Sequence, residues 1–77
     1  MGILEDLADK LASDAIDAAE ELGSDDILTE VAKQLGATST TMEETYLTSI
    51  RIRLSERRAR RYLQGVLSKA KSKQKGG

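Results

Sequence analysis

Several residue types are missing from this 77-residue sequence: cysteine, histidine, proline, tryptophan, phenylalanine and asparagine. Without cysteine, no disulfide can reinforce the small core that a chain of this length is able to bury. Without cysteine and histidine, the commonest nucleophile, general base and transition-metal ligands are absent. Without proline, nothing forces a helix to stop. We therefore expect a protein of the reducing cytoplasm that holds no metal and no cofactor.

Long apolar runs are missing as well, and none approaches the ~20 residues that a transmembrane helix needs. The N-terminus carries Glu5 and Asp6 where a secretory signal would be basic, and Asp6 also breaks the myristoylation pattern. Residues 57–71 have the charge of a membrane-surface helix but lack the large anchoring side chains. We therefore expect no membrane partner.

Carboxylates are abundant, but nothing in the sequence predicts catalysis. A catalytic acid needs burial to raise its pKa, and acidic residues on exposed helix faces of a short chain do not have it. No glycine-rich phosphate loop and no calcium-loop spacing occurs. We predict a protein that is not an enzyme.

The net charge of −1 conceals two halves of opposite sign. Residues 1–44 hold twelve acidic residues and two lysines, whereas residues 45–77 hold ten basic residues and one glutamate. Such asymmetry indicates an anionic partner for the basic half, or pairing of the two halves within or between chains.

Residues 3–22 have the period of an amphipathic helix. Its apolar face is rich in alanine, so a neighbouring helix can approach closely. That face consists of Leu4, Leu7, Ala8, Leu11, Ala12, Ala15, Ala18, Ala19 and Leu22. Gly23 follows in the position of a left-handed cap.

A second helix is predicted over residues 25–35, with Ser24 as its N-cap and Gly36 ending it as Gly23 ends the first. Its apolar face consists of Ile27, Leu28, Val31, Ala32 and Leu35. After a short turn, Thr40 and Glu43 have the spacing of a capping box.

A third helix is predicted over residues 41–70, and its apolar residues lie on two opposite faces. The first half contributes Tyr46, Leu47, Ile50 and Leu54, and the second half contributes Ala59, Leu63, Val66, Leu67 and Ala70. Either the helix breaks near residues 55–58, or its second half docks outside the domain. With a break, the second half would fold back on the first helix. With docking, Leu63, Val66 and Leu67 would form a self-association surface.

The second half of this helix is also strongly basic. Four arginines share the side opposite the apolar residues, and we call them the arginine ridge: Arg57, Arg58, Arg60 and Arg61. Arginine favours planar, bidentate contact with phosphate or carboxylate. Arg51, Arg53, Lys69 and Lys71 extend the predicted anion-binding set. The ridge is alternatively a solvated surface, or is neutralised by the acidic first helix.

The segment from Leu28 to Tyr46 carries Ala32, Leu35, Gly36 and Met42 at the positions where two helices meet at a tight turn. In this respect it resembles the helix-turn-helix domains of bacterial and phage regulators. The resemblance covers about nineteen residues and implies a DNA-binding second helix. The start of that helix is acidic, however, where base-reading residues are expected.

These observations predict an all-α fold: one helical domain over residues 1–71, with a long basic C-terminal helix and a flexible basic tail over residues 72–77. The function expected first is that of a nucleic-acid-binding regulator, for DNA or RNA, acting through the arginine ridge. The alternative is a protein-interaction module that binds an acidic protein surface or forms a homo-oligomer through its acidic and basic surfaces.

Overall fold

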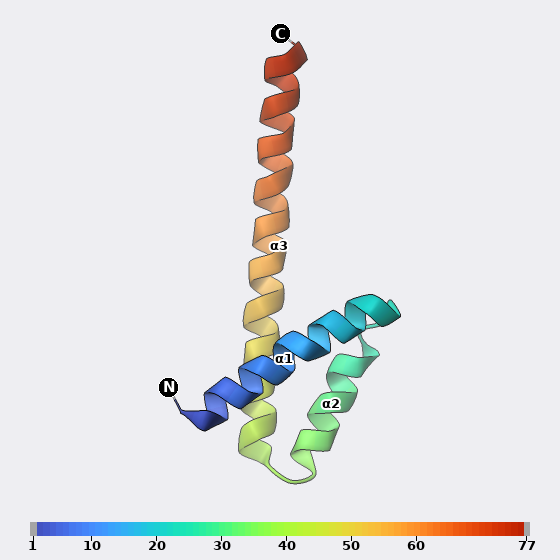
Figure 1. Ribbon diagram of the computed structural model, residues 1–77, viewed down its shortest axis with the longest axis vertical. Helices are drawn as coiled ribbons and strands as arrows, with labels where there is room; N and C mark the ends of the chain where they lie inside the picture. The colour runs from blue at the N-terminus through green and yellow to red at the C-terminus, as the bar shows by residue number, and fades with distance from the viewer. Residues whose placement is uncertain (1, 77) are drawn as a thin grey trace.

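The structure, a computed structural model, describes the backbone of residues 2–76 and the side chains of residues 2–72. It contains three helices: α1 (Ile3–Leu22), α2 (Asp26–Gly36) and α3 (Thr40–Gly76). Figure 1 shows α1 crossing the early part of α3 and α2 lying beside both, while the later turns of α3 project past them. The molecule is 59 Å long and 13 Å thick, because α3 alone sets its length. The predicted all-α, three-helix fold is confirmed.

The core is built on the alanine-rich face of α1. Nine apolar residues from all three helices are buried: Ala8, Ala12, Ala15, Ile16, Ala19, Leu28, Ala32, Tyr46 and Ile50. Ala8 and Ala12 are completely covered, since a methyl side chain lets a neighbouring helix approach the backbone closely. Sequence reasoning left out Ile16, and it counted Leu7 and Leu22 as part of the buried face although both are exposed.

Tyr46 is the largest side chain that is fully buried. Its hydroxyl donates a hydrogen bond of 2.9 Å to the backbone carbonyl of Leu28, so α3 is tied to α2 inside the core. Burial raises the pKa of Tyr46 above its ordinary value. Among the described side chains, no buried polar atom lacks a hydrogen-bond partner.

The two glycines that were predicted to end helices behave differently. Gly23 has the left-handed backbone expected of a cap, with φ of 68°, and Ser24 N–H donates to the Ala19 carbonyl at 3.0 Å. Gly36 lies inside α2, and Ala37 follows it with ordinary helical φ and ψ. The prediction of a left-handed cap at Gly36 is therefore wrong. A Cβ at Gly36 would lie 2.8 Å from the Glu43 carboxylate, so the lack of a side chain at Gly36 leaves room for the side chain of Glu43.

The caps of α2 and α3 also need correction in detail. The N-cap of α2 is Asp25, one residue after the predicted Ser24, whose hydroxyl accepts from the Asp26 N–H at 3.3 Å. At α3, the hydroxyl of Ser39 accepts from the Met42 N–H at 3.1 Å, so the cap lies one residue before the predicted Thr40. With Ser39 as the cap, the residue three positions later is Met42 and not Glu43, so the predicted capping box of Thr40 and Glu43 does not form.

α3 is continuous through residues 55–58, so the predicted alternative of a break there is wrong. The basic C-terminal part is an extension of the helix that enters the core. The predicted flexible tail, 72–77, lies outside the described side chains from residue 73 on, and it stays a prediction. Among residues 2–76, none of the helices has a stretch long and apolar enough to cross a lipid bilayer.

Candidate binding surfaces on the third helix

The part of α3 beyond the core is a cationic helix without acidic residues. Every side chain from residue 58 to residue 72 is exposed, and we call this segment the α3 arm. It carries five cationic residues, which are Arg58, Arg60, Arg61, Lys69 and Lys71. Glu56, just before the arm, is the last acidic residue of the chain.

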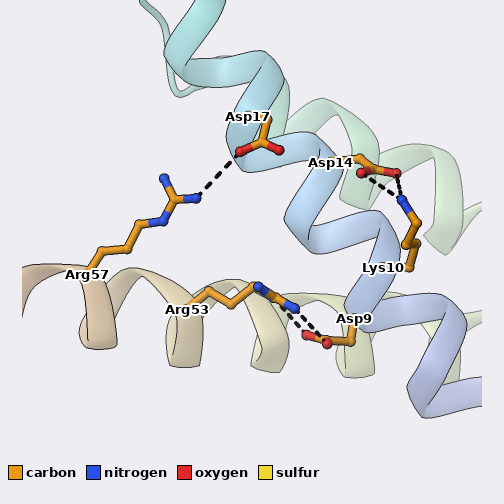
Figure 2. A network of polar contacts seen from close by, with 6 residues as sticks. All are labelled: Asp9, Lys10, Asp14, Asp17, Arg53 and Arg57. Carbon is orange, nitrogen blue, oxygen red and sulfur yellow. Dashed lines mark hydrogen bonds and ion pairs between the residues drawn. The ribbon is translucent and has the colours of Figure 1, made fainter.

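The predicted basic set begins before the arm, and there it is paired with α1. Arg53 donates two hydrogen bonds to the Asp9 carboxylate, of 2.8 Å from Nε and 2.7 Å from Nη2. Figure 2 shows this bidentate contact between α3 and α1. The hydrogen bond from Arg53 lowers the pKa of Asp9, and the same bond raises the pKa of Arg53.

Arg57 makes the next contact with α1. Its guanidinium lies 2.7 Å from the Glu20 carboxylate and 3.5 Å from that of Asp17, the second of which is drawn in Figure 2. The hydrogen bond to Glu20 is the main reason why the pKa of Arg57 is raised. The acidic first helix therefore neutralises Arg53 and Arg57, as one of the sequence-based alternatives predicted.

The remaining members of the basic set do not contact α1 in this way. Arg60 donates to Glu56 one turn earlier in the same helix, at 2.8 Å. Within the described residues, no ion pair is formed by Arg51, Arg58, Arg61, Lys69 or Lys71. The arginine ridge is thus divided between one arginine that holds α1, one paired within α3, and two that face solvent.

The side chains of Arg57, Arg58 and Arg61 also border a hollow of about 320 Å³ between the three helices. Its apolar wall consists of Ile16, Ala19, Leu28 and Leu54. Glu20 and Asp25 stand on the acidic side of the same hollow, so its charges nearly balance. Nothing in the sequence pattern indicated this hollow, because its walls come from residues far apart in the chain.

An apolar stripe runs along the opposite side of α3. Ile52, Ala59, Leu63 and Val66 follow one another at steps of seven, four and three residues, which place them on one face. Tyr62 and Leu67 border this face. Tyr62 is 75% exposed, Leu67 54% and Val66 45%. The residues predicted for self-association, Leu63, Val66 and Leu67, therefore lie on the surface.

The two faces of the arm have a simple origin. Tyr46 and Ile50 form the line by which α3 enters the core, and steps of three and four residues continue that line through the exposed Leu54 to Arg57 and Arg61. The ridge thus prolongs the core-facing side of α3. The apolar stripe prolongs the solvent-facing side.

The acidic start of α3 lies apart from all of these residues. Thr41 and Glu44 are exposed there, and Glu43 is turned onto Gly36. The first cation of α3 is Arg51. The residues that a helix-turn-helix protein would present to bases are thus hydroxyl and carboxylate groups in this chain.

Within the described residues, no group of three or more acidic, cysteine or histidine side chains is placed to hold a metal ion. Comparisons with protein-family models, with curated proteins and with solved structures found no match for this chain.

Proposed function

We propose that this protein binds nucleic acid through the cationic side of the α3 arm. One observation carries the proposal: residues 58–72 expose five cations and no acid on a helix that projects past the acidic part of the molecule. Phosphates attract such a surface regardless of base sequence, and the released counterions drive binding.

The ion pairs near the core indicate that phosphate binds to the arm and not to the rest of the basic set. Arg53 and Arg57 are bonded to Asp9 and Glu20, so recruiting them to phosphate would break contacts between α1 and α3. Arg58 and Arg61 need no such exchange, and a guanidinium can contact a phosphate through two N–H groups at once. Lys69 and Lys71 add two point charges further along the arm.

The mode of contact that we propose is binding to the phosphate backbone. The sequence of the turn between α2 and α3 resembles a helix-turn-helix, but Glu44 at the start of α3 would repel phosphates. We therefore rank a helix-turn-helix contact with DNA below binding through the arm. An acidic protein surface is a further possible ligand for the same cations.

The test is a titration of fluorescent duplex DNA and single-stranded RNA by fluorescence anisotropy. With about four phosphate contacts, the logarithm of the binding constant should fall with the logarithm of salt concentration at a slope of about −4 for duplex DNA. The variant Arg58→Ala/Arg61→Ala should reduce that slope by about two and weaken binding at every salt concentration. The comparison between the two probes decides between DNA and RNA.

The matched control is Lys10→Ala/Lys33→Ala, which removes the same amount of charge from α1 and α2. It should leave the salt slope unchanged, because both lysines pair with neighbouring acids. Absence of binding to either probe at about 50 mM salt would overturn the proposal. Equal losses in the two double variants would mean that net charge, and not the arm, governs binding.

A further inference from the structure

The apolar stripe of the arm is not needed for nucleic-acid binding, because it lies on the side opposite the ridge. Leu63, Val66 and Leu67 are each about half exposed, and Tyr62 more so. Contiguous exposure of large apolar side chains typically marks an interaction surface. The spacing from Ala59 through Leu63 to Val66 is that of a helix seam packing on another helix.

Pairing of two arms with each other is unfavourable on electrostatic grounds. Arg60 borders the stripe on one side and Lys69 on the other. Each arm carries five positive charges and no negative charge. Two arms in contact would bring like charges together along both edges of the seam. The stripe therefore needs a partner helix with acidic borders.

This chain itself has such a helix. The outer side of α1 exposes Ile3 and Leu7, of which 76% and 53% are accessible. Asp6, Asp14 and Glu21 are exposed on the same side, while the only base of α1, Lys10, is bonded to Asp14 at 3.1 Å. At about 1.5 Å per residue, the arm is ~22 Å long and α1 is ~30 Å long, so their lengths are compatible.

We infer that a second copy of this chain covers the stripe, with the arm of each copy packed on the outer side of α1 of the other. Such a reciprocal pair has two-fold symmetry and contains the same contact twice. Leu63 and Val66 then lie near Leu7 of the second copy, with Arg60 and Lys69 facing its acidic residues. Arg57, Arg58 and Arg61 of the ridge stay outward, and the negative charge that would repel a polyanion is partly neutralised.

The test uses charge reversal on each side of the contact. Wild-type protein, measured by light scattering or sedimentation equilibrium at low salt, should have twice the monomer mass at high micromolar concentration. Asp14→Lys/Glu21→Lys should be monomeric under the same conditions, and so should Arg60→Glu/Lys69→Glu. A one-to-one mixture of these two variants should recover the doubled mass, since both contacts of the mixed pair again join opposite charges.

Two further variants separate this inference from the proposed function. Leu63→Asp/Val66→Asp should be monomeric, whereas Arg58→Ala/Arg61→Ala should still form pairs, because those arginines lie away from the stripe. Circular dichroism checks that each variant keeps its helices. A monomeric wild-type protein, or a mixture of the charge-reversed variants that stays monomeric, would overturn the inference. These measurements contain no nucleic acid, so their outcome does not depend on whether the arm binds phosphate.

Discussion

The two halves of α3 belong to one continuous helix but have opposite surroundings. Tyr46 in the first half is completely buried and bonded to α2, whereas Tyr62 in the second half is 75% exposed. The first half places Tyr46 and Ile50 toward α1 and α2. The second half turns its apolar residues away and places arginines on the side that would otherwise continue the core. A helix can therefore be continuous in its backbone while the domain it belongs to ends partway along it.

The comparison also shows what holds each half in a helical form. The first half is stabilised by burial against two other helices, which is the main source of helix stability in proteins. The α3 arm depends on its own residues, which include the strong helix formers alanine, leucine, arginine and lysine, and on the Glu56–Arg60 pair. Its helicity should be more easily lost than that of the first half.

The largest expected effect on stability comes from replacing Tyr46 with alanine, and the same replacement at Tyr62 is its control. Tyr46→Ala empties the centre of the core and should reduce the free energy of unfolding by about 3–5 kcal/mol. That is a large part of the total stability of a domain this size. Tyr62→Ala removes the same atoms from an exposed site and should change the stability by less than about 0.5 kcal/mol. Urea unfolding followed by circular dichroism measures both.

Equal losses of unfolding free energy in Tyr46→Ala and Tyr62→Ala would contradict the description of a buried first half and an exposed second half. They would mean that the arm is packed in solution, as in the reciprocal pair. The unfolding is therefore measured at low protein concentration and high salt, where association contributes little.

A smaller effect is expected from pH at the contact between α1 and the first half of α3. The hydrogen bond from Arg53 lowers the pKa of Asp9 in the folded protein. Its contribution to stability is therefore complete above the unfolded pKa of about 3.9 and is lost as pH falls through the lower, folded pKa. The wild-type protein should unfold at a higher temperature than Asp9→Asn at neutral pH, and the two should converge in acid.

The matched control for this contact is Asp6→Asn, one turn earlier on α1. Asp6 takes part in no ion pair within the described residues, so its substitution should change the unfolding temperature little at any pH. A constant difference between wild-type and Asp9→Asn from neutral to acid pH would rule out the carboxylate as its source. The effect is modest, because both partners are partly exposed and solvent screens such pairs.

The smallest effect on stability is expected when the arm is removed beyond its first turn. A chain that ends at Arg61 keeps every buried residue and both arginines that contact α1. Its free energy of unfolding should stay within about 0.5 kcal/mol of the full-length value, measured under conditions where the protein is monomeric. Loss of cooperative unfolding in the shortened chain would show that the fold extends into the arm.

The sequence predicted the parts of this fold that depend on local pattern. The helix of residues 3–22, the left-handed Gly23 and the buried line of Tyr46 and Ile50 all follow from periodicity and cap chemistry. Gly36 was misassigned, because a glycine before a turn has the same local pattern whether it caps a helix or makes room for a neighbour. The distinction depends on Glu43, which reaches Gly36 only after the chain has turned.

The residues of the candidate site could be predicted from the sequence, but not which of them pair with α1 and which face solvent. Six arginines and two lysines were expected to act together on an anion, and the opposite charge of the N-terminal half pointed to pairing. Which arginines pair with α1 depends on how α1 crosses α3, and no local pattern encodes that crossing. Arg53 and Arg57 lie at the crossing. Arg58 borders the same hollow as Arg57 but forms no ion pair with α1 within the described residues, because one residue turns a helix by about 100°.

The length of the arm has an electrostatic consequence for the proposed contact with nucleic acid. Lys69 lies twelve residues beyond Arg57, which is about 18 Å along a helix. Mobile ions reduce the field of the acidic helix over a Debye length of about 8 Å at physiological ionic strength. In the unpaired protein, a phosphate near Lys69 is then screened from the carboxylates of α1, whereas at about 0.01 M salt, where the Debye length is about 30 Å, it is not. The arm thus acts as a spacer whose effectiveness depends on the salt concentration. Its attraction for a polyanion should stop strengthening when the salt concentration becomes very low.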